Sequence, residues 1–477
     1  MTLRNSVAAA AVWAVACMPL LYSAPPLEQR IQRVESGLQK ANRIKGGAVE
    51  RMTLTERMVH YEVPGVSVAV IHDGKIEWAL GYGKRDVESG QPVTTETLFQ
   101  AASLSKGVAA AVAMRLVEQG RLSLDEDVNA KLRSWKVPDN EFTKSEKITL
   151  RRLLSHNAGL TVHGFPGYAQ GAAVPTLMQL LDGKPPANTE AVRADKAPGS
   201  GFRYSGGGYE VMQLLVEDIT NKRFGDVARE LILDPLEMRR SAYEQPLGEE
   251  RARNAASAYR GDGTAIAGRW HTYPEMTAAG LWTTPSELAR FVMEIQKPGK
   301  ARRSETVKTM LTKSPGDYGL GIGLGETSGK ASFSHGGANE GYRCQYFAYR
   351  DIGEGAIVMT NGDNGGNLAS EILRAIAVEY GWVDYLPKER TVLKVDPAVL
   401  ASYVGDYQFP GGPLVNVKVK DGRLIAGVGS DVVELFAEEP DSFFDMDGQS
   451  PPVKFVKKDD GSIELHADGG VATRKRP

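Results

Sequence analysis

The chain contains almost no cysteine, and this scarcity limits its covalent chemistry. Of 477 residues only Cys17 and Cys344 are cysteines, and Cys17 lies in an apolar N-terminal stretch. If that stretch is removed, one thiol remains and no intrachain disulfide can form. Cys344 lies in a strand-like run over residues 341–347, so we expect a buried structural thiol rather than a nucleophile.

An excess of charge of either sign is also absent. Lys and Arg together number 57 and Asp and Glu 59, which gives a formal net charge of −2. A balance this close to zero gives no electrostatic reason to expect a nucleic-acid partner. The histidines show no metal-ligand spacing such as His-Glu-x-x-His, so we expect neither a metal site nor a cofactor.

Long hydrophobic runs are missing except at the N-terminus. Arg4 precedes an apolar stretch over residues 7–21, which is short for a membrane span. The pattern predicts a signal peptide over residues 1–24 and a periplasmic or secreted protein with no stable span after cleavage. The alternatives are an uncleaved anchor helix and a lipid anchor on Cys17, which follows the small residues of the segment 14–16.

The main part of the chain mixes helical and strand patterns, which indicates an α+β fold. Two β-rich runs flank Asp73-Gly74, a strong hairpin signal. Helical patterns are followed by strand-like runs and a closing helix, which suggests an antiparallel sheet with helices packed on it. The helical patterns cover residues 107–120, 150–159, 209–219, 285–295 and 368–380, and the strand-like runs cover residues 318–324, 341–349 and 355–361.

Helical periodicity disappears after about residue 386. Six short alternating runs follow, and Asp421-Gly422 and Asp460-Gly461 mark hairpins among them. We therefore expect a main domain over residues 25–385 and an up-and-down, barrel-like β module over residues 395–477.

Ser103 and Lys106 form the only Ser-x-x-Lys in the chain, just before the Ala-rich helical pattern. Residues at i and i+3 share one helix face, so the Lys106 amine can approach the Ser103 hydroxyl. A base within hydrogen-bond reach turns a serine into a good nucleophile. Ser105 is a weaker candidate because neighbours at i and i+1 do not face each other. Taken alone, the motif favours a helix N-cap followed by a surface lysine.

Two further motifs follow in order, Tyr204-Ser-Gly206 and His335-Gly-Gly337. With these separations the set resembles serine hydrolases of the class C β-lactamase and penicillin-binding-protein superfamily, from about Leu54 to Trp382. The resemblance implies a β-lactamase-like antiparallel sheet flanked by helices, together with a helical subdomain. The C-terminal module looks like the lipocalin-like β domain appended to some peptidase and esterase members.

The resemblance also implies a role for each motif. Ser103 is then the acylated nucleophile and Lys106 its proton acceptor. Tyr204 falls where the family places a second general base, which serves the leaving group and the deacylating water. His335 stands where many relatives have the lysine of a Lys-Thr-Gly strand. The alternatives are a core tyrosine bonded to backbone for Tyr204 and a satisfied strand histidine for His335.

The backbone of the third motif carries the expected binding surface. Gly336 and Gly337 let the substrate backbone approach closely, and the N–H of Ala338 would join that of Ser103 in an oxyanion hole. Gly206 replaces the asparagine of the family's Tyr-x-Asn, which argues against typical β-lactam and peptidoglycan recognition but leaves acyl transfer intact. The histidine form of the third motif resembles D-aminopeptidase-like and esterase-like members.

The sequence thus predicts a metal-free serine hydrolase that acts through a Ser103 acyl-enzyme on small esters, amides or peptides, of the esterase or D-amino-acid peptidase type. A class C-type β-lactamase remains an alternative, as does a penicillin-binding or sensing module that acylates without turnover. If a charged His335 helps to hold the substrate, activity should change on a limb at about pH 6 to 7.

Overall fold

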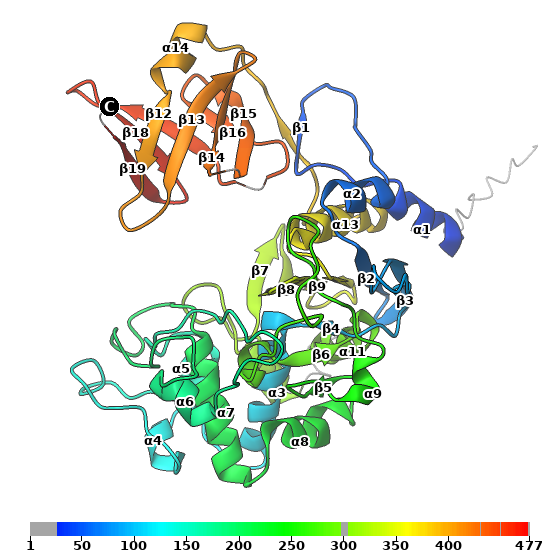
Figure 1. The fold of residues 1–477 in the computed structure, drawn as a ribbon, viewed down its shortest axis with the longest axis vertical. Coiled ribbons are helices and arrows are strands. Elements are labelled where there is room, and N and C mark those ends of the chain that lie inside the picture. Colours follow the sequence, from blue (N-terminus) through cyan, green and yellow to red (C-terminus); the bar gives the residue numbers. More distant parts are fainter. Residues whose placement is uncertain (1–25, 297–303, 430, 449, 476–477) are drawn as a thin grey trace, which may run out of the picture.

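The computed structural model describes residues 26–296 and 304–475, apart from residues 430 and 449. The predicted signal peptide and Cys17 lie outside these residues. Among the residues described, no helix is both long enough and apolar enough to cross a bilayer. A body of helices and sheet lies below a β-barrel in the view of Figure 1.

A six-stranded antiparallel sheet organises the body, in the spatial order β3-β2-β10-β9-β8-β7. Its strands are β2 (Gly65–His72), β3 (Lys75–Gly83), β7 (Gly323–Thr327), β8 (Lys330–Asn339), β9 (Tyr342–Tyr349) and β10 (Gly355–Thr360). The β2–β3 hairpin turns at Asp73-Gly74 as predicted, and β2 pairs with β10. The sheet therefore unites the N-terminal hairpin with strands from the end of the body.

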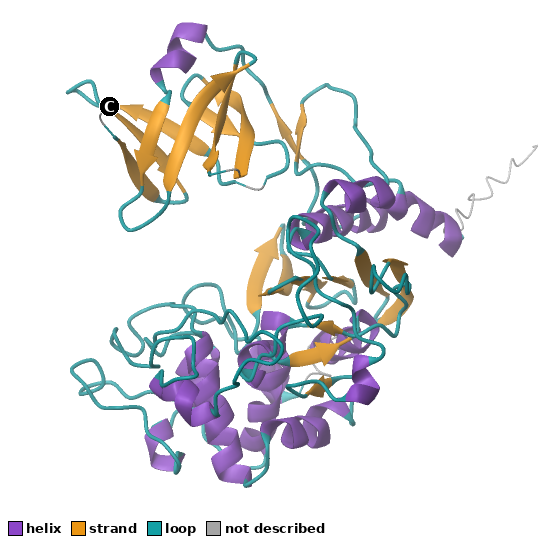
Figure 2. Ribbon diagram, in the orientation of Figure 1, coloured by secondary structure: helices purple, strands orange, loops and turns teal. Residues whose placement is uncertain are grey.

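Helices cover both faces of this sheet (Figure 2). Along β2, Val68 and Val70 join the core beneath α13 (Gly365–Tyr380), while Ala69 and Ile71 join the core on the side of α11 (Pro285–Gln296). Successive strand residues point to opposite faces, so this continuous apolar run is what burial on both faces requires. On the α13 face, α1 (Leu27–Glu35) packs against α13 as a second layer.

The predicted helices are present, with shifts at their ends. The longer ones on the α11 side are α3 (Ser105–Glu118) and α7 (Gly206–Thr220), and the predicted helix over residues 150–159 is the shorter α5 (Leu150–Leu154). Both α3 and α7 are buried over most of their length. α7 begins earlier than the predicted Tyr209, because the Ser205 hydroxyl accepts the N–H of Gly208 and caps it.

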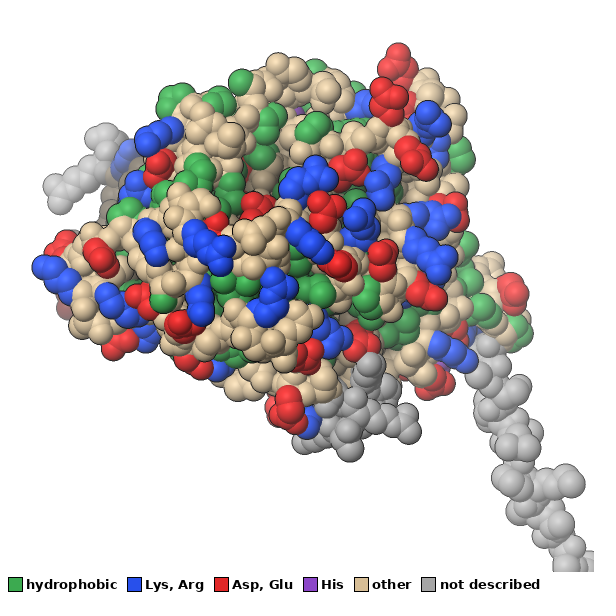
Figure 3. Space-filling view, turned by 90° about the horizontal axis from the view of Figure 1, so that it is seen from below, with side chains coloured by type: hydrophobic (Ala, Val, Ile, Leu, Met, Phe, Trp, Pro, Cys, Tyr) green, Lys and Arg blue, Asp and Glu red, His purple; other side chains and the backbone are tan. Residues whose placement is uncertain are grey.

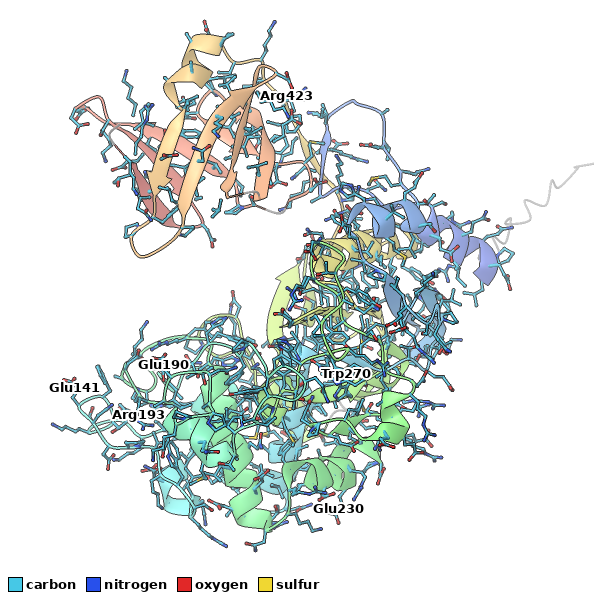
Figure 4. All side chains as sticks on the ribbon, in the orientation of Figure 1. Glu141, Glu190, Arg193, Glu230, Trp270 and Arg423 are labelled. Carbon is cyan, nitrogen blue, oxygen red and sulfur yellow. The ribbon has the colours of Figure 1, made fainter. Side chains whose placement is uncertain are left out.

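The remaining elements of the body are short. They are α2 (Leu54–His60), α4 (Val128–Lys131), α6 (Leu177–Asp182), α8 (Phe224–Ala228), α9 (Glu249–Ala252), α10 (Met276–Ala279), α12 (Glu305–Met310), the 3-10 turn η1 (Ala102–Leu104), the π-turn η2 (Arg229–Leu233), and the strands β1 (Asn42–Ile44), β4 (Phe99–Gln100), β5 (Ala242–Tyr243), β6 (Leu281–Thr283) and β11 (Lys388–Arg390). The long segment 161–203 is mostly loop and contains the one short helix α6. Arg193, labelled in Figure 4, ties this segment to α6 by donating to the Leu181 carbonyl at 3.2 Å.

The strand predicted over residues 318–324 is wrong for its first part. Gly321 has a φ of 81°, which a strand does not accommodate, and Gly319 N–H donates to Ile322 in a tight turn. A Cβ at Gly321 would lie 2.6 Å from the Cβ of Ala110. The turn packs directly on α3, so β7 starts only at Gly323.

The C-terminal residues form a closed eight-stranded antiparallel barrel. In chain order its strands are β12 (Gly405–Gln408), β13 (Leu414–Lys420), β14 (Arg423–Val428), β15 (Asp431–Glu439), β16 (Ser442–Phe444), β17 (Val453–Lys457), β18 (Ile463–Ala467) and β19 (Gly470–Arg474), preceded by α14 (Pro397–Ser402). Sequence patterns missed β16, which is very short, and β19, which buries little apart from Ala472. β19 pairs with β12 and closes the barrel.

The surface carries no dominant charge on the face in Figure 3, where Lys and Arg side chains alternate with Asp and Glu. This mixture agrees with the near-zero net charge.

The close approach of β8 to η1 brings two distant motifs together. A Cβ at Gly337 would lie 2.5 Å from the Ala101 carbonyl oxygen and 2.9 Å from Leu104 Cδ1. Real Cβ atoms do not come this close to backbone, so only glycine lets the strand reach the turn that carries Ser103. At Gly336, by contrast, a Cβ would meet nothing within 4 Å.

We expect Gly337→Ala to destabilise the protein by about 1–3 kcal/mol, since the new methyl must push β8 away from η1. Gly336→Ala is the matched control and should leave stability within about 0.5 kcal/mol of wild type. Urea unfolding followed by fluorescence measures both variants. Equal midpoints for the two would show that β8 and η1 are less closely packed than described.

Candidate active site

Ser103 lies in η1, the 3-10 turn directly before α3, which agrees with the predicted position at the N-terminal end of the buried helix. Ala102, which precedes it, has a φ of 48°, a left-handed conformation that costs a non-glycine residue about 1–3 kcal/mol. Ser103 is partly exposed, whereas Ala102 and Leu104 on either side are buried. The strained turn thus presents one hydroxyl to the surface from an otherwise buried segment.

Ser105, the other serine of the motif, has a structural position. Its side chain is buried, donates to the Ala102 carbonyl at 2.5 Å and accepts the N–H of Leu281 at 3.0 Å. These two bonds fix the η1 turn to the edge of β6. Because Ser105 has no exposed surface and its hydroxyl already donates one hydrogen bond and accepts another, it is unsuited to attack a substrate.

Lys106 is buried, with only 2% of its surface exposed, and its amine points at Ser103. Nζ donates to Ser103 Oγ at 3.1 Å and to the Ala278 carbonyl at 2.8 Å. The same nitrogen lies 5.0 Å from the ring centroid of Tyr204 and 5.6 Å from that of Tyr209. The structure therefore brings the first and second motifs together around one buried amine.

His156 contacts Tyr204 and the residue after it, and no sequence motif predicted this contact. Its ring lies 4.1 Å from that of Tyr204, and its Nδ1 accepts the N–H of Ser205 at 3.1 Å. Burial, followed by the charge of Lys106, holds the pKa of His156 well below its usual range. A neutral imidazole thus positions the phenol at the start of α7.

His335 is fixed by both of its ring nitrogens. Nδ1 lies 2.6 Å from the Gly336 carbonyl, which can only accept, so Nδ1 carries the proton. Nε2 is then an acceptor for the Tyr318 hydroxyl at 2.7 Å. Tyr318, which sequence reasoning did not place in the site, directly precedes the tight turn before β7 and could not be found from spacing alone.

The electrostatic surroundings keep this imidazole neutral. Burial, and secondly the charge of Lys106, lowers the pKa of His335 from 6.5 to about 4. The expectation of a charged His335 with an activity limb at about pH 6 to 7 is therefore wrong for the free protein. His335 contributes a neutral, oriented ring, whose centroid lies 6.2 Å from that of Tyr204.

The end of β8 beside His335 has a free edge. Residues 335–339 pair with β9 on one side, whereas β7 reaches only as far as Ser334 on the other. Gly336 and Ala338 are exposed there. A strand edge with unpaired backbone groups next to a partly exposed serine is a geometry in which an extended substrate can bind.

Gly206 leaves no space for a longer side chain. A Cβ at this position would lie 2.6 Å from Cε2 of Phe165 and 3.2 Å from the His163 carbonyl oxygen. The Phe165 ring from the segment 161–203 therefore occupies the region that an asparagine side chain would need. In this structure the Phe165 ring and a side chain at position 206 therefore exclude each other.

Two other groups with possible chemistry lie away from these residues. Cys344 is buried, its Sγ lies 3.2 Å from the Gln100 carbonyl, and burial raises its thiol pKa to about 12, which confirms a structural thiol. Among the described residues, one trio of potential metal ligands clusters, His72, Asp73 and Glu354. Nδ1 of His72 already lies 2.6 Å from Oε1 of Glu354, so this ring nitrogen is engaged in a hydrogen bond.

Comparison with known proteins shows the family to which the chain belongs. Residues 51–380 match the family described as Beta-lactamase. The D-aminopeptidase of Brucella canis is 25% identical over 394 residues, which cover 80% of this chain and 71% of that protein. Protein flp of Staphylococcus aureus strain N315 is 26% identical over 228 residues, which cover 47% of this chain and only 42% of flp.

Solved structures share the fold. An octameric penicillin-binding protein homologue from Pyrococcus abyssi superposes with a TM-score of 0.61 at 23% identity, covering 88% of this chain and 98% of that one. The D-amino acid amidase from Ochrobactrum anthropi SV3, complexed with L-phenylalanine amide, gives a TM-score of 0.59 at 20% identity, covering 74% and 99%. These likenesses establish the β-lactamase-like α+β fold.

We expect the His335 imidazole to remain neutral from pH 8 down to about pH 5, because its pKa is about 4. The unfolded chain protonates this ring near pH 6.5, so His335 leaves stability unchanged above that value and lowers it as pH falls from 6.5 toward 4. Two-dimensional NMR of the imidazole, assigned with His335→Gln, measures the titration. A midpoint near 6.5 in the folded protein would contradict the described burial.

Proposed function

Because the chain belongs to the beta-lactamase family and is a serine hydrolase, we propose that Ser103 attacks the carbonyl of a small amide or peptide and forms an acyl-enzyme. The observation that carries the proposal is the 3.1 Å contact between Ser103 Oγ and the buried Nζ of Lys106. A serine becomes nucleophilic when a base lies within this distance.

In the proposed acylation the neutral amine of Lys106 takes the Ser103 proton while Oγ bonds to the substrate carbonyl carbon. The N–H groups of Ser103 and Ala338 stabilise the oxyanion. When the intermediate collapses, the carbon–nitrogen bond breaks and a proton passes to the leaving amine through Tyr204. Water then attacks the ester: as its oxygen bonds to the carbonyl carbon, its proton passes through Tyr204 to the neutral amine of Lys106. When the second intermediate collapses, the bond from the carbon to Oγ breaks, Lys106 returns the proton to Oγ, and the acid leaves.

The neutral His335 bears on which substrates fit. Both ring nitrogens are occupied, by Tyr318 and by the Gly336 carbonyl, and the ring carries no charge at neutral pH. It therefore offers no cation to a substrate carboxylate, which a lysine in the same place would do. This favours substrates with an uncharged end beside β8, such as amides, over those with a free carboxylate.

The lack of space beside Gly206 also bears on the choice of substrate. Phe165 fills the region beside Tyr204, so the site offers an apolar ring where an amide side chain would bind a β-lactam's acylamide group. Similarity to a D-aminopeptidase, and to the fold of a D-amino acid amidase, adds support for amides of D-amino acids or short D-peptides. Small esters, which acylate a serine more readily, are expected as alternative substrates.

The wider organisation belongs to the same proposal. We assign catalysis to residues 25–385 and treat residues 395–477 as a separate, lipocalin-like accessory domain. The N-terminal stretch would export the protein to the periplasm or medium, where small amides and peptides are accessible. No cofactor is needed for the proposed steps.

Ser103→Ala should lower kcat/KM by about 10⁴-fold or more, since it removes the atom that is acylated. It should also abolish labelling by a fluorophosphonate probe, detected by mass spectrometry of the peptide. Ser105→Ala is the matched control, which should keep the label despite losing two hydrogen bonds. A label on any residue other than Ser103 would overturn the assignment.

Tyr204→Phe should lower kcat by about 10²- to 10⁴-fold, because a general acid–base group is removed while the ring remains.

The assay compares D-alanine p-nitroanilide, p-nitrophenyl acetate and nitrocefin. Turnover of the anilide supports the amidase. A burst equal to the enzyme concentration without further product indicates instead a module that acylates once, and preferred hydrolysis of nitrocefin indicates a β-lactamase.

A further inference from the structure

The backbone groups of β8 alternate between its two neighbouring strands, and this alternation decides what its free edge offers to a substrate. The Arg350 N–H donates to the Ala331 carbonyl at 2.8 Å, so Ala331 and every second residue after it direct their backbone groups toward the β9 side. The residues between them point the other way, because the bonding directions alternate along an antiparallel strand. β7 pairs with this second side as far as Ser334. Beyond that residue, Gly336 and Ala338 present their N–H and carbonyl groups at an open edge.

A side chain of the same strand covers the first of these two carbonyls. His335 Nδ1 donates to the Gly336 carbonyl at 2.6 Å, so the imidazole lies against the edge at this residue. The ring is also held from behind, since its Nε2 accepts the Tyr318 hydroxyl at 2.7 Å. Ala338, two residues further along the edge, is exposed. The two outward-pointing residues of the edge are therefore unequal, because the carbonyl of Gly336 already has a donor.

Tyr318 is a fixed donor because its own position is held from several sides. Only 6% of its surface is exposed, and its ring lies 4.9 Å from that of His156 and 5.6 Å from that of Phe202. Its carbonyl accepts the N–H of Ser314 at 2.7 Å. Donation from this fixed hydroxyl favours the His335 tautomer whose proton is on Nδ1, which is the tautomer that can donate to the strand edge.

We propose that Tyr318 is a positioning residue that holds the His335 ring over Gly336 and so shortens the edge that a substrate can use. An extended substrate that pairs with β8 finds Ala338 open and the other outward-pointing carbonyl covered by the ring. A longer substrate must displace the ring before it can pair further along the strand. The arrangement thus favours small amides over longer peptides. The inference rests on the proposed function, because it concerns which substrates reach Ser103.

Loss of the Tyr318 hydroxyl releases one end of the His335 ring. In Tyr318→Phe the aromatic ring remains, whereas Nε2 of the imidazole loses its donor. The imidazole can then take its other tautomer, in which Nδ1 carries no proton and no longer donates to the Gly336 carbonyl. A hydrogen bond of this kind changes the equilibrium between the two states by about 3- to 10-fold.

The first measurement determines the tautomer and does not depend on catalysis. The full chain is labelled with ¹⁵N in histidine, and NMR compares wild type with Tyr318→Phe, with His335→Gln to assign the ring. We expect the wild-type proton on Nδ1 and a mixture of both tautomers in Tyr318→Phe.

Tyr346→Phe is the matched control for this measurement. Tyr346 lies directly opposite His335 on β9 and is fully buried, as Tyr318 nearly is. Within the described part of the chain, however, the Tyr346 hydroxyl has no hydrogen-bond partner. Its removal should therefore leave the wild-type tautomer of His335 in place.

The second measurement determines the preference for substrate length. Values of kcat/KM are compared for D-alaninamide and for the amides of di- and tri-D-alanine, with the products identified by mass spectrometry. The ratio of kcat/KM for the longer amides to that for D-alaninamide should rise by about 3- to 10-fold in Tyr318→Phe. In Tyr346→Phe this ratio should stay at the wild-type value. A loss of folded protein alone would lower all three values together and leave the ratio unchanged.

A double-mutant cycle tests whether Tyr318 acts through His335. His335→Ala removes the ring that covers Gly336, so this variant should raise the same ratio by itself. Adding Tyr318→Phe should then have no further effect on the ratio, because no imidazole remains for the hydroxyl to hold. A further rise in the double variant would contradict the inference, since Tyr318 would then act by another route.

The outcomes also separate this inference from the function on which it rests. If wild type and Tyr318→Phe show the same tautomer or the same ratio, the inference is wrong, while labelling of Ser103 still supports the hydrolase. If Ser103 does not label in wild type, the proposed function fails and the restriction on substrates fails with it. A mixture of tautomers in Tyr318→Phe together with a raised ratio supports both.

Discussion

Lys106 lies almost completely out of water, and this burial constrains every group around it. Among the described residues, the amine donates to two uncharged oxygens, those of Ser103 and Ala278. In the proposed mechanism this amine is the base that takes the proton of the Ser103 hydroxyl. The rings of Tyr204 and Tyr209 beside it supply faces that attract a transient positive charge.

The same burial explains why the neighbouring ionisable groups are neutral at physiological pH. His156 and His335 have lowered pKa values, and Glu210 and Glu275 have raised ones, with desolvation as the largest cause in each case. In the proposed reaction, charge that develops on the substrate would therefore meet oriented backbone dipoles, an arrangement that stabilises a transition state.

Sequence patterns predicted the helices and strands that carry strong periodicity or a cap. The buried helix after Ser103, the hairpin at Asp73-Gly74 and the alternation in the C-terminal module are examples. Sequence patterns did not predict the elements whose bounds depend on contacts with distant parts of the chain. β19 has almost no apolar signal and forms by pairing with both β18 and β12. The turn before β7 is kept out of the strand by the packing of Gly321 on α3.

The sequence by itself determined the family, the order of the three motifs and the residues on them, because i to i+3 spacing and glycine positions are local properties. Only the tertiary structure decided the protonation of His335 and the contact of His156 with Tyr204. It also decided the hydrogen bond from Tyr318 to His335 and the burial of Glu210 and Glu275. These depend on desolvation and on neighbours far away in the chain, and no local pattern encodes how much water a side chain loses when the chain folds.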